Sequence, residues 1–389
     1  MQVKQIYSLT NDIVGELTGK TDLVAEDLSN IVDVGTEVFN ATSVDNYVKT
    51  LVNRIGKVIF VNRLYKGNAP SLLMDSWEFG SVLQKIQCEL PEAEENATWK
   101  LTNGTEYKQD IFKSPVVSAK FFNKKVTFEI DMSFTDRQVK ESFNSANELN
   151  GFLSMVQASI EKAMTIRIDS LIMRTINNMT AETLYNEFPD VSDGDYSAIS
   201  GVKAVNLLKL YNDKIAPAPK LTVEKALTNS DFIRFAVLTM SNYRDRLSKM
   251  STLFNIGEKE RFTPSEMLHT IVLSDFANSA DVYLQSDVYH NEFTKMVNYE
   301  RVPYWQGTGT DYSFGKVSDI HVNTVSGHEI IASGILAVMF DKDAIGVSNL
   351  DRRVTTAYNA KAEFTNTFTK FDCGYFNDTN ENFIVYFIA

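Results

Sequence analysis

The feature of the sequence that most constrains the fold is a helical pattern that runs without a proline from Asn147 to Asn178. Apolar residues recur there at steps of three and four, as in an amphipathic α-helix, and Ser145 or Asn147 is the expected N-cap. At 1.5 Å per residue such a helix would be roughly 48 Å long. Its apolar face is too broad for the narrow seam of a coiled coil, so we expect other elements to cover it along its length.

A second constraint is a long excursion between two strand patterns, Phe79–Leu90 and Lys120–Phe134. About 29 residues rich in Glu, Asn, Thr and Lys separate them, whereas a compact hairpin loop has roughly 2–5. Large apolar side chains in an exposed loop often mark an interface, and the candidates here are Trp99, Tyr107, Ile111 and Phe112. Two interpretations stay open: a disordered surface loop, or a β-hairpin that leaves the body to reach a partner.

The N-terminal region combines polar and helical patterns. Residues 1–20 predict an extended or loosely ordered arm, because aliphatic residues are scattered among polar ones and two glycines. A short helix is expected within Thr21–Asn40 and a second after Ser43, which is a good N-cap, with Gly56 as its stop signal. The β-branched segment Lys57–Leu64 then predicts a strand.

The rest of the chain alternates between helices and strands. We expect a helix capped by Ser200, a helix after Ser230, the strand Leu268–Leu273 and a short helix at Phe276–Val282. This alternation predicts a compact α+β lobe from about 190 to 335. Further strand patterns predict a C-terminal sheet that packs under the long helix. They are Glu329–Phe340, Ala360–Phe371 and Asn382–Ile388.

Composition limits the classes of function. The net charge is −12, from 38 basic and 50 acidic side chains, and a protein that grips phosphates needs the opposite balance. No run of about 18 apolar residues predicts a membrane span, and Met1–Thr10 lacks the apolar core of a secretory signal. Cys88 and Cys373 lie far apart in sequence, so we expect two small core residues and no disulfide.

Motifs for catalysis or metal binding are not found in the sequence. None of the four histidines has a partner at metal-ligand spacing, and there is no nucleophile elbow or P-loop. The segment Gly307–Thr310 lacks the P-loop lysine, so we interpret it as a turn that brings Trp305 to a neighbouring subunit. We therefore predict no catalytic, cofactor-binding or metal-binding residues and a chain that is not an enzyme. Its extended parts are expected to bury apolar surface on other subunits.

The order of these elements resembles the major capsid proteins of tailed bacteriophages, which have the Hong Kong 97-type fold. Locally, Gly334–Gly346 (GILAVMFDKDAIG) looks like the family's strand after the axial domain, and Met267–Phe293 with Val302–Gly307 looks like head proteins of phages of Gram-positive bacteria. The resemblance implies an α+β fold with an N-terminal arm (1–78), an extended loop (79–134), a peripheral domain (135–189 and 336–389, spine helix about 147–178) and an axial domain (190–335).

The same resemblance implies a major head protein. Its subunits would assemble through hexamers and pentamers into an icosahedral or prolate shell that encloses dsDNA without sequence-specific binding. It would form in the bacterial host cytoplasm and become part of the virion. Only about 78 residues precede the loop, so a separate scaffolding protein is expected, with a portal and decoration proteins as further partners. The alternatives are an encapsulin-like nanocompartment shell, a soluble α+β enzyme, or a tail or adhesin component.

Overall fold

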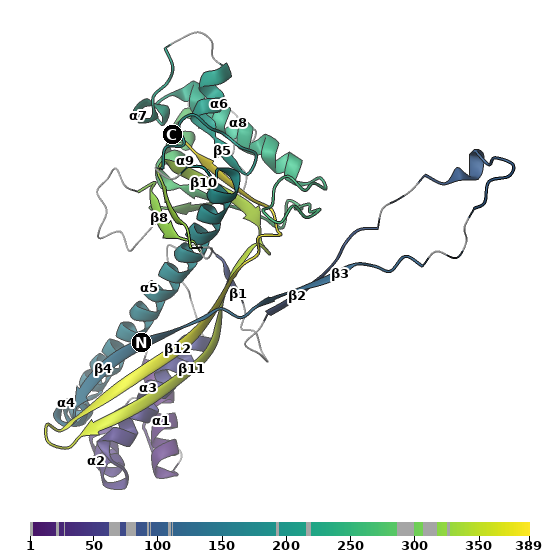
Figure 1. The fold of residues 1–389 in the computed structure, drawn as a ribbon. Coiled ribbons are helices and arrows are strands. Elements are labelled where there is room, and N and C mark those ends of the chain that lie inside the picture. Colours follow the sequence, from purple (N-terminus) through teal and green to yellow (C-terminus); the bar gives the residue numbers. More distant parts are fainter. Residues whose placement is uncertain are drawn as a thin grey trace.

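The structure is a computed structural model, and it confirms the α+β fold class. It describes residues 3–20, 23–26, 28–61, 71–74, 83–91, 93, 95–107, 110, 112–191, 194–214, 219–285, 299–305, 317–324 and 327–389. No helix within these ranges is long and apolar enough to cross a membrane. Two sheets share one long helix, and a hairpin projects away from both (Figure 1).

The long helix α5 spans Ala146–Glu187 and is 42 residues long, about 63 Å at the usual rise. The Ser145 side chain caps it by accepting a hydrogen bond from the amide of Glu148 at 3.2 Å. The helix continues nine residues beyond the predicted end at Asn178 and stops just before Pro189. Thr183 of this extension can be buried because its hydroxyl donates to the carbonyl of Met179 inside the helix at 2.8 Å.

A four-stranded sheet packs along α5 in the order β1-β11-β12-β4. The longest pair in it is antiparallel, between β11 and β12, and β12 also pairs with β4. Strand β11 was not expected from the sequence, and β12 begins and ends later than the predicted strand Ala360–Phe371. The strands are β1 (Leu73–Met74), β4 (Lys125–Thr135), β11 (Ile345–Asn359) and β12 (Phe364–Asn377).

A second sheet has five strands in the order β5-β13-β10-β6-β7. Its central strands β10 and β13 are buried along their whole length, because alternate residues pack against α5 on one face and against α8 and α9 on the other. The prediction that Asn382–Ile388 joins the sheet under the long helix with Ala360–Phe371 is therefore wrong. The strands are β5 (Ala204–Asn206), β6 (Leu268–Leu273), β7 (Glu300–Val302), β10 (Ile335–Asp341) and β13 (Phe383–Phe387).

Four helices lie beside this second sheet: α6 (Leu207–Lys214), α7 (Val223–Ala226), α8 (Ser230–Leu247) and α9 (Ser274–Gln285). The strand Leu268–Leu273 and the helix after Ser230 are confirmed. The helix expected at Ser200 begins only at Leu207, after strand β5, where the Asn206 side chain accepts from the amide of Lys209 at 3.1 Å.

The predicted strand Glu329–Phe340 is two strands. β9 (Glu329–Ala332) pairs with β8 (Ile320–Asn323), whereas β10 belongs to the five-stranded sheet. The break is at Gly334, whose φ of +72° suits glycine and whose backbone lies so close to Ile388 that a Cβ atom would collide with its carbonyl oxygen.

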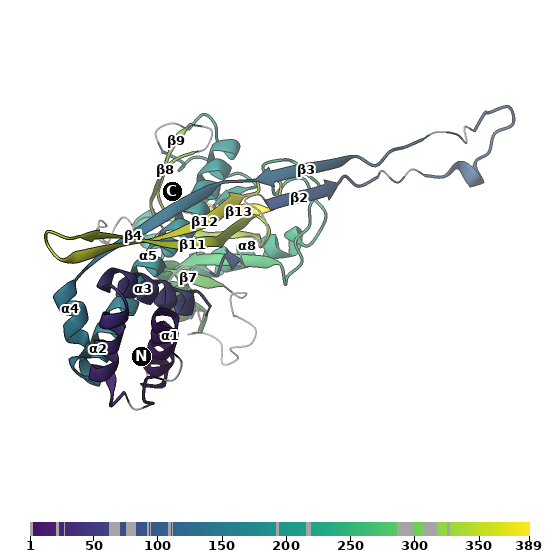
Figure 2. The same cartoon turned by 90° about the horizontal axis from the view of Figure 1, so that it is seen from below.

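The predicted extended arm at residues 1–20 is wrong. The N-terminal region forms three helices, α1 (Val3–Thr18), α2 (Ile31–Ala41) and α3 (Val44–Val61), which lie under the four-stranded sheet (Figure 2). Leu9, Ile13 and Val14 of α1 are buried, so this helix adds to the core. Helix α3 runs through Gly56 to Val61, which corrects the strand expected from Lys57; residues 62–64 lie outside the described ranges.

The predicted strand Lys120–Phe134 is divided at Asn123–Lys124. Its first part belongs to β3 (Val117–Phe122), which pairs with β2 (Leu83–Cys88) in a two-stranded hairpin. The second part is β4, which turns back into the four-stranded sheet and is followed by the short helix α4 (Asp136–Glu141). The described residues between 89 and 116 extend beyond the hairpin, with one turn of 3-10 helix at the tip, Ala97–Trp99 (Figure 1).

Candidate interface at the projecting hairpin

The projecting segment between β2 and β3 carries large side chains that the subunit itself does not cover. Trp99 is 95% exposed and Phe112 is 90% exposed, and Leu101 is also largely in solvent. Tyr107 is partly ordered against the tip, since its hydroxyl accepts a hydrogen bond from the amide of Thr102 at 3.0 Å. Three of the four aromatic and aliphatic side chains predicted for this loop are therefore at its surface. The fourth, Ile111, lies outside the described residues.

The hairpin strands β2 and β3 have an unusual distribution of polar and apolar residues. Directly opposite residues share a face, so one face carries the pairs Gln84–Phe121, Ile86–Ala119 and Cys88–Val117. This face points to solvent, and Ile86 is 66% exposed. The other face turns toward the body and carries Lys85, Lys120 and Gln87. At these positions the usual arrangement of a two-faced strand is reversed, because polar groups point inward and apolar groups outward. The apolar pair Leu83–Phe122 at the base of the hairpin faces inward as well, and Phe122 is buried.

Lys85 and Lys120 lie directly opposite each other in the hairpin, an arrangement that is destabilising for like charges unless an anion compensates them. Asp378 is that anion, and its carboxylate is completely buried. Its Oδ2 lies 3.0 Å from Lys85 Nζ and its Oδ1 lies 2.8 Å from Lys120 Nζ, so one carboxylate binds both strands. Burial alone would raise the pKa of Asp378, but the hydrogen bond and charge of Lys120 and Lys85 hold it below its ordinary value.

A second carboxylate widens this cluster. Glu381 Oε1 lies 3.0 Å from Lys85 Nζ and accepts from the Gln87 amide at 3.2 Å. Arg261, from the loop after α8, approaches the other Glu381 oxygen at 3.4 Å and also donates to Gln87. Burial would lower the pKa of Lys85, but the two carboxylates raise it above its ordinary value. The root of the hairpin is thus tied to the body by hydrogen-bonded charges, with one aromatic contact, Phe122 on Phe376 at 5.0 Å between ring centroids.

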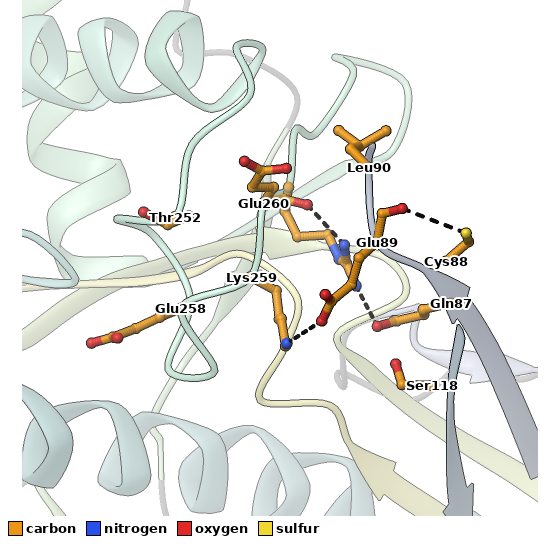
Figure 3. A pocket seen from close by; sticks show the side chains of 10 residues that line it. Gln87, Cys88, Glu89, Leu90, Ser118, Thr252, Glu258, Lys259 and Glu260 are labelled. Atoms are coloured by element: carbon orange, nitrogen blue, oxygen red, sulfur yellow. Dashed lines mark hydrogen bonds and ion pairs between the residues drawn. The ribbon is translucent and has the colours of Figure 1, made fainter. Parts of the chain in front are cut away.

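A pocket of about 430 Å³ lies between the hairpin and the loop 251–261. In Figure 3 the side chains of Glu89 and Lys259 point toward each other across it, and their charged atoms are 2.8 Å apart. The lining is polar, with Thr252 and Ser118 at its edges. Because Lys259 of the loop pairs with Glu89 of the hairpin across it, we interpret the pocket as a seam between two parts of the subunit.

Two sequence predictions about single residues are corrected by their burial. Trp305, predicted to contact a neighbouring subunit, is only 1% exposed, and its ring N–H donates to the carbonyl of Ile335 at 2.8 Å. Its own carbonyl accepts from Asn177 of α5 at 2.6 Å, so it joins the long helix to the five-stranded sheet. Cys88, predicted to be a core residue, is exposed on the outer face of the hairpin, whereas Cys373 is buried as expected.

Sequence reasoning found the tip but missed the charge cluster at the root. The alternation of lysine with apolar residues in Lys85–Ile86 and Lys120–Phe121 was a signal for a two-faced strand, but it did not say which face turns inward. Gly307–Thr310 lies outside the described residues. Within the described ranges, no group of three or more His, Cys, Asp or Glu side chains could hold a metal ion.

Comparisons with solved structures find phage capsids. The chain is similar to a protein in the capsid structure of Staphylococcus phage Andhra (9% identity, TM-score 0.48, covering 83% of this chain and 84% of that one). It is also similar to one in the capsid structure of the cyanophage P-SCSP1u (11% identity, TM-score 0.45, covering 84% and 88%). No curated protein matches the sequence significantly.

The sequence itself matches one family model over residues 8–387, almost the whole chain, and that family is described as the Phi29-like phage major capsid protein. A major capsid protein is a structural component that forms the shell of the virion from many copies of itself. The nanocompartment and enzyme alternatives are therefore not favoured. The chain belongs to the Phi29-like phage major capsid protein family, and it is a shell-forming protein of the virion and not an enzyme.

Proposed function

We propose that the chain assembles through hexamers and pentamers into a closed shell around phage dsDNA, and that each projecting hairpin lies on a neighbouring copy. The observation that carries this proposal is the reversed polarity of the hairpin: Ile86, Val117 and Phe121 face outward while Lys85 and Lys120 face inward. Contiguous apolar surface of this kind is costly to leave in water and marks an interaction site. Trp99 at the tip and Phe112 in the segment that leads back to β3 add further exposed apolar surface.

The partner we infer for this surface is a second copy of the chain, because a shell protein meets its own copies on all sides. The outer face of β2 and β3 carries no charged side chain, so an apolar area on a neighbour would suffice to cover it. Burying a side chain the size of Ile86 or Phe121 contributes about 1.5–3 kcal/mol. Several such contacts from each hairpin, repeated around a shell, would hold it together.

The proposed division of the subunit follows the Hong Kong 97-type arrangement. We propose residues 1–78 as the N-terminal region, 79–134 as the extended loop, and α5 with the four-stranded sheet as the peripheral domain. The axial domain would be residues 190–335 together with β10 and β13, since these two strands belong to the five-stranded sheet. This changes the boundaries expected from the sequence, which gave 336–389 to the peripheral domain.

Further parts of the proposal concern assembly. We propose that a separate scaffolding protein guides assembly in the host cytoplasm, and that a portal and decoration proteins complete the head. The net charge of −12 supports a shell that encloses DNA without gripping it, because like charges on the protein and the polymer repel. DNA would then be held by enclosure, without sequence-specific contacts.

Removing residues 92–113 tests the proposed role of the hairpin. The deletion leaves six residues, 89–91 and 114–116, between β2 and β3, enough to close a hairpin. We expect a folded subunit, measured by circular dichroism, that forms no closed shells in electron micrographs. The matched control is a full-length variant with Trp99→Ser and Phe112→Ser, which removes the exposed aromatic side chains without shortening the chain. It should also assemble poorly. Normal shells from the deletion variant would contradict the proposal.

A further inference from the structure

We propose that Asp378 is a positioning residue that fastens the hairpin to two links between the sheets, residues 342–344 and 378–382. The direction of the hairpin then follows any change in how the two sheets are arranged. The attachment is a property of the single subunit. Its consequence for assembly rests on the proposed function of the hairpin.

Asp378 is the first residue of a link between the two sheets. Strand β12 ends at Asn377 in the four-stranded sheet, and β13 begins at Phe383 in the five-stranded sheet. The turn 378–382 is therefore one of the links between the sheets. The other nearby link is 342–344, which joins β10 of the five-stranded sheet to β11 of the four-stranded sheet.

Hydrogen bonds join these two links to each other and to the hairpin. The amide of Asp378 donates to the carbonyl of Ala344 at 2.7 Å, which connects one link to the other. Lys85 Nζ donates to the carbonyl of Asp343 at 3.0 Å as well as to Asp378, so this one side chain contacts both links. Lys120 Nζ donates to Asp378 and to the Thr379 hydroxyl, 3.1 Å away. The hairpin is thus held at the place where the sheets are connected.

The charges show why this attachment resists rotation of the hairpin. Asp378 is fully buried, and both of the cations that bind its oxygens come from the hairpin. If the hairpin swung away, the carboxylate would lose two charge-assisted hydrogen bonds at once, and bonds of this kind are the strong ones. In contrast, the pair Lys259–Glu89 farther out has side chains that are about half exposed, and such pairs hold weakly. The stiff part of the attachment is therefore at Asp378, and the weaker contacts lie toward the tip.

A distance measurement on the unassembled full-length subunit tests this inference. Spin labels at Thr98→Cys near the tip and Met155→Cys on the exposed side of α5, in a Cys88→Ser background, report the direction of the hairpin. In the parent we expect one narrow distance distribution from double electron–electron resonance. In Asp378→Asn we expect the distribution to broaden and its maximum to shift. Asp213→Asn, which breaks only the exposed pair with Lys209, is the matched control and should leave the distribution unchanged.

Because Asp378→Asn could fail to fold, Lys120→Met provides a second variant, which keeps the contact of Asp378 with Lys85. Folding of both variants is checked by circular dichroism. A distribution as narrow as the parent's in every folded variant would overturn the attachment, whatever the shells look like. A broadened distribution together with normal shells would support the attachment and overturn the proposed role of the hairpin in shell closure. Broadening together with irregular or absent shells is the result we expect.

Discussion

Two antiparallel strand pairs of the subunit, β2–β3 and β11–β12, alternate polar and apolar residues in opposite senses. In β11–β12 charged residues lie on the outer face, where Arg353 binds Asp372 at 2.7 Å, whereas Phe371 and Cys373 are buried on the inner face. The charged residue on the inner face is Arg352, which donates to the carbonyl of Val52 in α3 at 2.9 Å. In β2–β3 the lysines turn inward and Ile86 and Phe121 face outward. Periodicity alone is the same in both pairs. What differs is whether the outer face meets water or, as we propose, another subunit.

The comparison predicts that similar side chains in the two pairs serve different processes. A residue buried inside the subunit stabilises the fold, whereas a residue that only a neighbour covers stabilises the assembly. Substitutions at matched positions should therefore separate the free energy of unfolding of the isolated subunit from the concentration at which shells form.

The largest effect on folding is expected from Phe371→Ala in β12. Phe371 is buried and packs against Phe128 with ring centroids 5.3 Å apart. Removing a buried phenylalanine costs about 3–5 kcal/mol, so urea denaturation should show a loss of that size. The matched change Phe121→Ala in β3 should alter the free energy of unfolding by only about 0.5 kcal/mol, as is usual for exposed residues. Equal losses in both variants would contradict the difference between the pairs.

The outer face of the hairpin should control assembly instead. The double variant Ile86→Ser and Phe121→Ser removes two apolar contacts, each worth about 1.5–3 kcal/mol if a neighbour covers it. Each contact then shifts the association constant by roughly tenfold or more, so the lowest concentration that gives shells in light scattering should rise. Thr355→Ser, on the exposed face of β11, is the control. If the double variant assembles like the parent, the outer face is not an interface.

Much of this comparison could not be drawn from the sequence. The helix α5 and strand β6 were predictable because long apolar periodicity or a short β-branched run marks them. Strand β11 was missed because alternate positions such as Asp351 and Arg353 face water, so the segment looks like a polar loop. Helix α1 was mistaken for an arm although the apolar spacing of Leu9, Ile13 and Val14 was present.

The charge cluster at the hairpin root was out of reach for a different reason. Asp378 is 258 positions from Lys120, and only the folded register brings the two together. A sequence with 50 acidic side chains does not show which of them will be buried beside two lysines. The tip was predictable because large apolar residues such as Trp99 are conspicuous in a polar loop, whereas Trp305 shows that the same signal can also mark a core residue.

A smaller effect is expected from acid on the inward face of the hairpin. The pKa of Asp378 is lower in the folded chain than the ordinary value of about 3.9, so its contribution to stability is complete above that pH. It is lost as the pH falls through the lower, folded pKa. Urea denaturation at several pH values should therefore show the parent's advantage over Asp378→Asn shrinking only below about pH 4.

Other groups around Asp378 set the control for this titration. The parent and Asp378→Asn share all the other charged groups of this cluster, which are Glu381, Asp341, Lys85, Lys120 and Arg261. The difference in unfolding free energy between the two proteins therefore reports the titration of Asp378 to first order. An advantage that stays constant down to strongly acid pH would mean that the carboxylate does not bind the lysines as ions.

The smallest effect is expected from an ion pair of the same chemistry on the outer face of the four-stranded sheet. Lys370 and Glu129 lie 3.1 Å apart with side chains 36% and 42% exposed, whereas the carboxylate that binds Lys85 and Lys120 is buried. Glu129→Gln should lower the free energy of unfolding of the isolated subunit by less than about 1 kcal/mol, and high salt should remove the loss by screening. Urea denaturation in low and high salt measures this. A larger loss of unfolding free energy that persists in high salt would mean that water does not screen this face. The contrast between the strand pairs β2–β3 and β11–β12 would then have to rest on their apolar residues alone.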